Sequence, residues 1–362
     1  MPGPVLILGG YGNFGKRIAE ALAQDNIPII IAGRNEAKAK ALAAALPGPG
    51  KTAIFDIRTD LNDQLAAYRP SVVINTCGPF QDADYAVAEA CIAHGIHYID
   101  LADGRDFVAG INTLNTDALS AGVSVVAGAS TVPGLSSAVL AHFDKEFGRI
   151  DNMRYGINPG QKTERGLATT QGIMSYIGKP IKPFKGQARK TYGWQNLYRQ
   201  DYPGLGKRWM ANCDIPDLDL LAQHYGLKSI QFSAGLELGV LHLGVWALSW
   251  LVRLGLPLNL PKRAAFLLRM SDLLNRFGSD DGGMHVTLTG TAKDGASKAV
   301  TWTIVAKGGD GPYIPTIPAV ILAKRLFAGD TVPVGAMPCI GLIPLEDYLA
   351  ELHGKAIETF LD

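Results

Sequence analysis

Val5-Leu6-Ile7-Leu8-Gly9-Gly10-Tyr11-Gly12-Asn13-Phe14-Gly15 is the stretch that decides the fold. Four apolar residues run into the spacing Gly10-x-Gly12-x-x-Gly15, and helical sequence follows to Gln24. Such glycines permit a tight turn, close approach of a pyrophosphate and close packing of the helix, whose N-terminus holds the phosphates. The alternative is a glycine-rich connection without a ligand. The residues predicted to bind a dinucleotide are Gly10, Tyr11, Gly12, Asn13, Phe14 and Gly15.

The end of the second predicted strand, residues 28–32, favours NADP (NADPH) over NAD. NAD-binding proteins place Asp or Glu there on the ribose 2′-hydroxyl, whereas this chain has Gly33-Arg34-Asn35. A guanidinium forms charge-assisted bonds to a 2′-phosphate, which a carboxylate would repel. We therefore expect Gly33, Arg34, Asn35 and, one helical turn later, Lys38 to contact the cofactor. Alternatively, Arg34 and Lys38 are solvated charges of a surface turn.

Strand and helix patterns alternate through the first third of the chain. Strands are expected at 5–8, 28–32, 52–57, 71–76, 97–101 and 123–127, with helices at 16–24, 36–46, 61–68, 84–94 and 108–121. This alternation predicts an α/β protein with an N-terminal Rossmann doubly wound parallel sheet, whose strand ends share one rim. Asp56 ends the third strand, where it either meets the adenine amino group or caps a turn.

Beyond residue 130 the pattern is mixed. We expect a helix to Phe147, strands at 152–157 and 229–237, helices at 239–255 and 261–277, and a hairpin of 285–292 against 299–306. The stretch before Trp209 is rich in Gly, Lys and aromatic residues. These patterns predict a Rossmann domain (1–130), an α+β substrate or dimerisation domain with an antiparallel sheet (131–310), and a C-terminal helical segment that returns to the Rossmann domain (311–362).

Composition limits the classes of function. The 362 residues carry a net charge of +1 and are 47% hydrophobic, so the chain has no basic field for nucleic acid and enough apolar residues for a sizeable core. Its four cysteines form no CxxC or Cys/His cluster, and the N-terminus shows no secretory signal. We expect a cytoplasmic, metal-free protein with a small-molecule substrate.

One apolar segment, Leu238 to Leu258, is long enough to resemble a membrane span. His242 and Arg253 interrupt it and Pro257 ends it, so we expect a buried or dimer-interface helix. A peripheral membrane contact is the alternative, because Arg253, Lys262 and Arg263 are placed to snorkel at a lipid surface.

Two further motifs resemble the saccharopine dehydrogenase-like family of NADP-binding oxidoreductases. They are residues 73–80 (VINTCGPF) and 90–100 (ACIAHGIHYID), and the segment 335–346 (GAMPCIGLIPLE) resembles the ending of many bacterial members. The resemblance implies a Rossmann domain and an α/β substrate domain around a cleft, and a homodimer. It also implies that the end of the fourth strand borders the nicotinamide ribose. The residues concerned are Asn75, Cys77, Gly78, Pro79 and Phe80.

The sequence identifies the catalytic residues less clearly than the cofactor-binding residues. Around the fifth strand, Asp103 is the best carboxylate on the rim and Tyr98 a second candidate, while Lys162 is a candidate cation for the substrate. Arg165, Arg189 and Lys190 are further candidates, although each fits a solvated surface charge equally. The family commonly has Gly then Glu after this strand, whereas this chain has Asp103 then Gly104.

Three functions follow from these observations. The first is an NADP(H)-dependent oxidoreductase acting on a small amino acid, imine or carbonyl substrate. The second is a non-catalytic NADP(H)-binding sensor or scaffold, and the third is a lipid reductase that works at a membrane surface. Lysine-pathway members of the family carry Asp-Pro-Gly where this chain has Val132-Pro133-Gly134, so we do not expect saccharopine itself to be the substrate.

Overall fold

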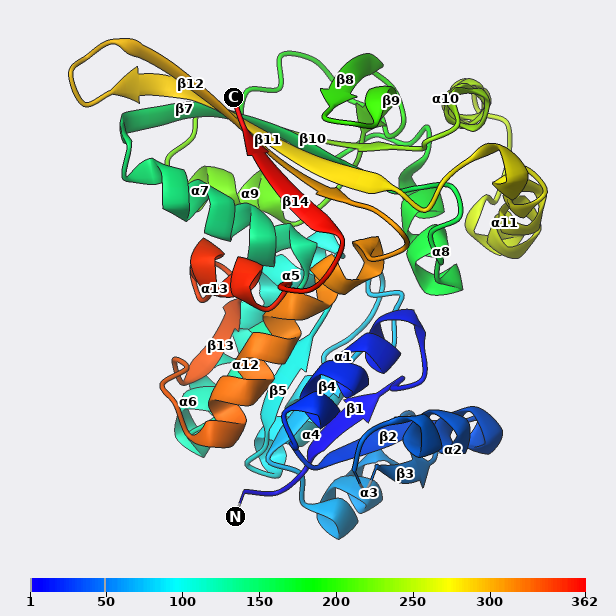
Figure 1. Ribbon diagram of the computed structural model, residues 1–362, viewed down its shortest axis with the longest axis vertical. Helices are drawn as coiled ribbons and strands as arrows, with labels where there is room; N and C mark the ends of the chain where they lie inside the picture. The colour runs from blue at the N-terminus through cyan, green and yellow to red at the C-terminus, as the bar shows by residue number, and fades with distance from the viewer. Residues whose placement is uncertain (1, 49) are drawn as a thin grey trace. The chain divides into compact units, whose positions relative to one another are not determined.

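The computed structural model describes residues 2–48 and 50–362. The chain divides into two compact units. The first comprises Met1–Ala138 and Tyr313–Glu351, and the second comprises Val139–Pro312 and Leu352–Asp362. Figure 1 shows the elements of each unit.

The first unit contains a seven-stranded parallel sheet with the order β13-β6-β5-β4-β1-β2-β3. The strands are β1 (Val5–Leu8), β2 (Ile29–Gly33), β3 (Lys51–Ile54), β4 (Val72–Asn75), β5 (His97–Asp100), β6 (Ser124–Ala127) and β13 (Gly335–Pro338). β1, β4 and β6 are buried along their whole length. Continuous apolar strands of this kind form because helices cover both faces of a parallel sheet.

Helices cover this sheet as α1 (Asn13–Gln24), α2 (Glu36–Ala45), α3 (Leu61–Tyr68), α4 (Ala86–Ala93), α5 (Arg105–Gly110), α6 (Asn115–Ala121), α12 (Ile317–Ala328) and α13 (Leu345–Ala350). The helix α12 packs on α1, β4 and β5, whereas α4 contacts α3 and α6. The α1 helix buries Ile18, Ala19, Leu22 and Ala23, the spacing of a helix with one core-facing side. The Rossmann doubly wound fold is confirmed.

The second unit contains a seven-stranded sheet with the order β14-β12-β11-β7-β10-β9-β8. The strands are β7 (Phe147–Asn158), β8 (Tyr198–Tyr202), β9 (Gly206–Asn212), β10 (Ser229–Gly235), β11 (Gly282–Ala292), β12 (Ser297–Ala306) and β14 (Ile357–Leu361). The helices are α7 (Ser136–Asp144), α8 (Leu167–Tyr176), α9 (Asp217–His224), α10 (Gly239–Arg253) and α11 (Ala264–Asp272). The chain passes from the first unit to the second within α7. Short helical turns are η3 (Pro261–Arg263) and η4 (Asn275–Phe277) in the second unit, η1 (Ile111–Leu114) and η2 (Thr131–Leu135) in the first unit, and η5 (Gly311–Thr316) where the chain passes from the second unit to the first.

Three expectations about strands were wrong. The second sheet is mixed rather than antiparallel, because β7 and β10 pair in parallel. The strands β13 and β14 lie in the C-terminal segment where only helix was expected. β13 contains Gly335 and Pro338, which both disfavour strands. It forms because its backbone pairs with β6 and because Ala336 N–H donates to Asn115 Oδ1 at 3.0 Å.

Candidate functional site

The glycine turn joins β1 to α1. Gly9 has a φ of +73°, and Gly12 N–H donates to Gly9 O at 2.8 Å. A Cβ on Gly10 would lie 2.9 Å from Ile7 O, and a Cβ on Gly15 would lie 2.8 Å from Gly10 Cα. The tight turn and the close helix approach therefore explain Gly10 and Gly15 without a ligand.

Gly12 differs from its two neighbours in the motif. A Cβ there would meet Gly9 O at 3.0 Å and no other atom within 4 Å, apart from its own chain neighbours and helix. Gly12 is also the N-cap of α1 and provides no side-chain cap, and no acidic residue lies in the first turn of this helix. The first N–H groups of a helix need acceptors and attract anions. The space beside Gly12 and the uncapped helix end thus fit a pyrophosphate.

Tyr11 covers the end of β2. A Cβ on Gly33 would lie 2.5 Å from the Tyr11 ring, so only glycine leaves room for this ring. The Tyr11 hydroxyl accepts a hydrogen bond from Asn35 N–H at 2.8 Å. Asn35 in turn caps α2, because its Oδ1 accepts from Lys38 N–H at 3.0 Å. Tyr11, Gly33 and Asn35, which were all predicted to contact the cofactor, therefore contact one another at the end of β2.

A basic cluster lies beside this turn. The side chains of Arg34 and Arg58 are 71% and 75% exposed and approach the Asp56 carboxylate at 3.9 and 3.4 Å. The hydrogen bond from the Arg58 backbone N–H lowers the pKa of Asp56, and the charges of Arg58 and Arg34 lower it further. Desolvation raises this pKa but is outweighed. Arg58 was not among the predicted residues. The sequence signal was Asp56-Ile57-Arg58 shortly after the third strand. Lys38 is exposed on α2.

The loop after β4 has an internal framework. The buried Asn75 accepts from Cys77 N–H at 3.0 Å and donates through Nδ2 to the Tyr98 hydroxyl at 3.2 Å. Thr76 donates its hydroxyl hydrogen to Leu8 O at 2.8 Å, which ties this loop to β1. Burial raises the pKa of Cys77 to about 11, which keeps the side chain a neutral thiol. Asn75 therefore shapes the loop.

Other residues predicted around this loop have interior side chains. Phe80 is buried and its ring lies 5.2 Å from the ring of Phe107. Tyr98 is buried in β5, and desolvation raises the pKa of its hydroxyl well above the ordinary value. The hydrogen bond from Asn75 gives Tyr98 a positioning role. Gly78 and Pro79 are joined by a cis peptide bond in this loop.

Two carboxylates follow β5 in different environments. Asp100 is fully buried, and its Oδ1 accepts from Ala102 N–H at 2.9 Å and Gly128 N–H at 2.8 Å. It holds the ends of β5 and β6 together. Asp103 is partly exposed and accepts from Gln81 Nε2 at 3.0 Å. Desolvation raises the pKa of Asp103 against the effect of this hydrogen bond. Of the two carboxylates, only that of Asp103 is therefore accessible at the rim.

Asp100 gives a prediction for stability against pH. Desolvation raises its pKa from 3.8 to about 6, so between these values the folded state holds a proton that the unfolded state has lost. The free energy of unfolding should therefore fall as the pH rises from about 4 to 6, by up to about 3 kcal/mol. Asp100→Asn keeps the oxygen acceptor, and its free energy of unfolding should no longer fall over this pH range. Urea unfolding at pH values from 4 to 8 measures this free energy.

The control for this experiment is Asp117→Asn, which changes an exposed carboxylate on α6. Its unfolding curve should follow the wild-type pH dependence. If the Asp100→Asn variant kept the full wild-type dependence of the unfolding free energy on pH, a group other than Asp100 would be responsible for it.

The predicted substrate cations lie in the second unit. Lys162 is exposed, and its N–H donates to Ser279 O at 2.9 Å. Arg165 donates to Ser271 Oγ at 3.0 Å and forms an ion pair with Asp272 at 3.5 Å. These contacts give Arg165 a structural partner within the unit and leave the role of Lys162 a prediction.

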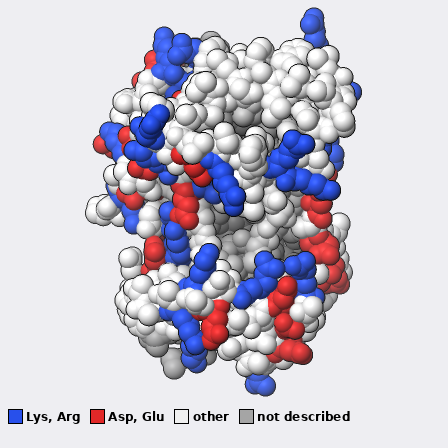
Figure 2. Space-filling view, turned by 90° about the vertical axis from the view of Figure 1, so that its right-hand side faces the viewer, with Lys and Arg blue, Asp and Glu red and all other residues white. Residues whose placement is uncertain are grey.

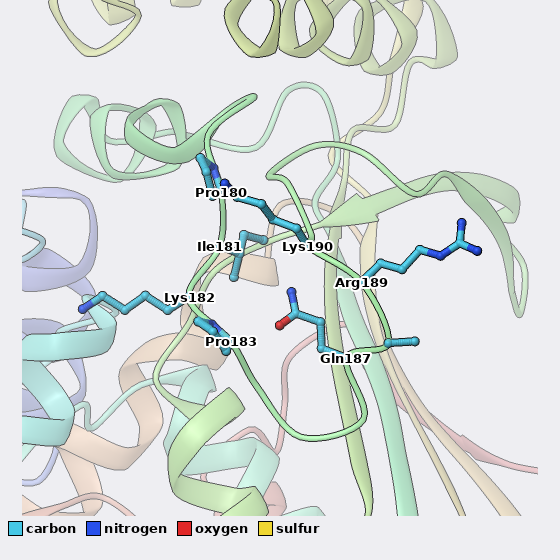
Figure 3. A pocket seen from close by; sticks show the side chains of 8 residues that line it. Pro180, Ile181, Lys182, Pro183, Gln187, Arg189 and Lys190 are labelled. Atoms are coloured by element: carbon cyan, nitrogen blue, oxygen red, sulfur yellow. The ribbon is translucent and has the colours of Figure 1, made fainter.

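Arg189 and Lys190 line a cavity of about 560 Å³ with Pro180, Ile181, Lys182, Pro183, Gln187 and Ala188. Figure 3 shows Lys182 and Arg189 pointing to opposite sides, so the cations do not converge on one anion. Among the described residues, no group of three or more His, Cys, Asp or Glu side chains is arranged to hold a metal ion.

A buried ion pair in the second unit was also missed. Arg208 is 3.5 Å from Glu237 and donates to Asn158 Oδ1 at 3.0 Å. Desolvation raises the pKa of Glu237, but N–H donors from Gln161 and Ser279 and the charge of Arg208 outweigh it and lower the pKa. The sequence signal was Glu237 at the end of the predicted strand 229–237. The pair fixes the loops at one end of β7, β9 and β10.

Residues 5–127 match the family model of the saccharopine dehydrogenase NADP binding domain. The resemblance inferred from the motifs is thus confirmed for the Rossmann part of the chain. This part of the chain is similar to the NADP binding domain of saccharopine dehydrogenase. No curated protein sequence matches the chain.

Solved structures extend the similarity in fold to both units. The saccharopine dehydrogenase (L-Glu forming) of Saccharomyces cerevisiae is 15% identical with a TM-score of 0.68, and the alignment covers 99% of this chain and 100% of that chain. A homospermidine synthase of Legionella pneumophila, in complex with NAD, is 10% identical with a TM-score of 0.62, covering 100% and 92%. An amine dehydrogenase of Mycobacterium smegmatis is 12% identical with a TM-score of 0.52, covering 95% and 96%.

Proposed function

We propose that this protein is an NADP(H)-dependent oxidoreductase that transfers a hydride to or from a small amino acid, imine or carbonyl substrate. The observation that carries the proposal is the open space at Gly12 beside an uncapped helix N-terminus, followed at the end of β2 by Arg34 in place of a carboxylate. The match of residues 5–127 to an NADP-binding domain supports it.

The preference for NADP(H) rests on the basic cluster. Arg34 and Arg58 extend from the ends of neighbouring strands, and both guanidinium groups are exposed. Their only carboxylate partner in the ion pairs of the described residues is Asp56. A 2′-phosphate carries more negative charge than a hydroxyl and forms charge-assisted bonds with arginine. We therefore assign the 2′-phosphate to this cluster.

The cofactor would supply or accept the hydride when it is bound. The chain must then exclude water, orient the substrate and hold or move a proton. Asp103 is suited to the proton step because burial raises its pKa while Gln81 fixes the orientation of its carboxylate. Asn75 and Tyr98 hold the neighbouring loop in place through their hydrogen bond.

Two measurements test the proposed activity. Calorimetry with NADPH and NADH measures binding, and NADPH oxidation in the presence of keto acids and amines, singly and in pairs, measures turnover. Tight binding of NADPH without turnover of any of these substrates would instead indicate a sensor that uses the same nucleotide site.

Arg34→Ala should weaken NADPH binding by about one to two orders of magnitude and NADH binding far less. The reason is that NADH has no 2′-phosphate, and a charge-assisted hydrogen bond contributes roughly 1.5 to 3 kcal/mol. Calorimetry with both cofactors measures the difference. Lys51→Ala is the matched control, because Lys51 is exposed at the opposite end of the same sheet. Equal losses for NADPH and NADH would indicate that Arg34 supports the local structure instead.

A further inference from the structure

The helix α10 carries apolar side chains on two sides, because Val245, Leu248 and Val252 pack against the buried Ile177, Trp194, Ala211 and Leu260 while others remain exposed. Its fully buried residues are His242 and Ser249, which are polar. Its exposed large apolar residues are Val240, Leu243, Trp250, Leu251 and Leu254, and Leu254 is 73% exposed. These positions recur with the helical period and so form one stripe along the helix. A helix of a soluble protein normally turns such a stripe toward the core.

The next helix continues this apolar surface. Phe266, Met270, Leu273 and Phe277 are exposed and are spaced four, three and four residues apart, from α11 into η4. The exposed fractions of Phe266 and Leu273 are 63% and 67%. Scattered apolar residues are common on protein surfaces, but apolar side chains exposed with helical spacing on two successive helices mark an interaction site. We refer to the exposed side chains of residues 240–277 as the α10–α11 face.

The charges of this face are predominantly positive. No acidic residue occurs between Glu237 and Asp272. The segment 238–278 carries five basic residues and one acidic residue, namely Arg253, Lys262, Arg263, Arg269, Arg276 and Asp272. Asp272 pairs with Arg165. In the part of the chain that the structure describes, no ion pair involves any of the five cations.

Figure 2 shows this side of the molecule. The α10 and α11 helices lie on the right of Figure 1, which faces the viewer in Figure 2. The upper part of that view is a broad area without charged side chains, with Lys and Arg at its margins. The expectation of a buried or dimer-interface helix therefore holds for one side only: Val245, Leu248 and Val252 pack against the core, and the dimer interface stays a prediction.

We propose that the α10–α11 face binds the surface of an anionic lipid bilayer. Apolar and aromatic side chains enter the boundary between headgroups and acyl chains, while the surrounding cations attract anionic headgroups. Trp250, Phe266 and Phe277 provide aromatic groups of the type that anchor proteins at this boundary. No helix in the described residues is long and apolar enough to cross a membrane, so the contact is peripheral.

Charge complementarity favours a bilayer over a second copy of this chain. A symmetric dimer contact sets a surface against itself, and here it would bring five cations and one carboxylate from each copy together. Like charges in contact oppose association. An anionic bilayer instead supplies the opposite charge to the cations, although Arg253 also donates to Gln195 Oε1 at 2.6 Å within the unit.

The test is co-sedimentation of the full chain with vesicles. Vesicles of phosphatidylcholine with about one third phosphatidylglycerol should bind the protein, and pure phosphatidylcholine vesicles should bind it far less. Binding should weaken when the salt concentration rises, because salt screens the attraction. Lys262→Gln with Arg263→Gln should lower the partition coefficient by about fivefold for each cation.

A second variant tests the apolar contribution. Leu254→Ser with Phe277→Ser removes two exposed side chains and should lower the partition coefficient by at least about tenfold. The matched apolar control is Leu119→Ser on α6, and the matched charge control is Lys145→Gln with Lys293→Gln. Both controls should bind vesicles as the wild type does, and thermal unfolding verifies that every variant is folded.

Three results would overturn the proposal. They are failure of the wild type to bind the phosphatidylglycerol vesicles, wild-type binding by the Leu254→Ser, Phe277→Ser variant, and equal loss in a control. Light scattering identifies the competing occupant. A wild-type dimer that becomes a monomer in this variant, without binding of vesicles by either protein, would show that a second copy covers the face.

Discussion

Gly12→Val should lower the affinity for NADPH by two or more orders of magnitude, which is equivalent to about 3 kcal/mol or more of binding free energy. The helix N-terminus at Gly12 is uncapped, and the surrounding space is closed only by Gly9 O, 3.0 Å from the position of a Cβ. A branched side chain would occupy the space that a pyrophosphate needs in order to reach the N–H groups of α1. Calorimetry with NADPH measures the loss.

The matched control for Gly12→Val is Gly166→Val. Gly166 is also the N-cap of a helix, α8, with a φ of −68° compared with −74° for Gly12. A Cβ on Gly166 would meet no atom closer than 3.6 Å, so both variants make the same chemical change at a helix start. Gly166→Val should retain NADPH affinity. If a folded Gly12→Val protein bound NADPH normally, the glycine turn would have only a structural role.

The first sheet could be predicted because β1, β2 and β4 are short apolar runs and because strand and helix patterns alternate regularly along this part of the chain. Burial of both sheet faces makes this pattern strong, as in Val5–Leu8 and Val72–Asn75. β13 could not be predicted from its residues because Gly335 and Pro338 disfavour a strand. Its conformation depends on β6, whose residue Ser124 lies more than two hundred positions earlier in the chain.

The candidate site was predictable where neighbouring residues define it. The spacing of Gly10, Gly12 and Gly15 describes a turn within one short segment, and the structure assigns a separate steric reason to each glycine. Contacts between separate strand ends were not predictable. The approach of Arg34 to Asp56 depends on the pairing of β2 with β3.

Side-chain direction explains the remaining differences. Tyr98 and Asp100 lie close in sequence to the rim, but their side chains are buried and hydrogen-bonded inside the fold. In a strand, successive side chains point to opposite faces. In a doubly wound sheet both faces are covered, so alternation alone does not identify the residue that reaches the rim. That residue comes from the loop, and here Asp103 is the one held by Gln81.

Asp103→Asn should retain NADPH binding and lower turnover by about two to four orders of magnitude if Asp103 moves the substrate proton. The amide oxygen of asparagine still accepts the hydrogen bond from Gln81 Nε2, so the loop should keep its shape. The amide cannot exchange a proton under these conditions. Turnover is measured with a substrate found in the NADPH oxidation screen, and NADPH affinity is measured separately.

The control for this variant is Asp106→Asn, which changes an exposed carboxylate three residues later, in the first turn of α5. It should leave turnover close to that of the wild type. The pH profile adds a second readout, since the limb that reports ionisation of Asp103 should disappear in Asp103→Asn. Desolvation raises the pKa of Asp103, so that limb should lie above the ordinary range for an aspartate. An Asp103→Asn protein with normal turnover and an unchanged profile would remove Asp103 from the mechanism, and the proton would then have to come from the substrate or from a cation such as Lys162.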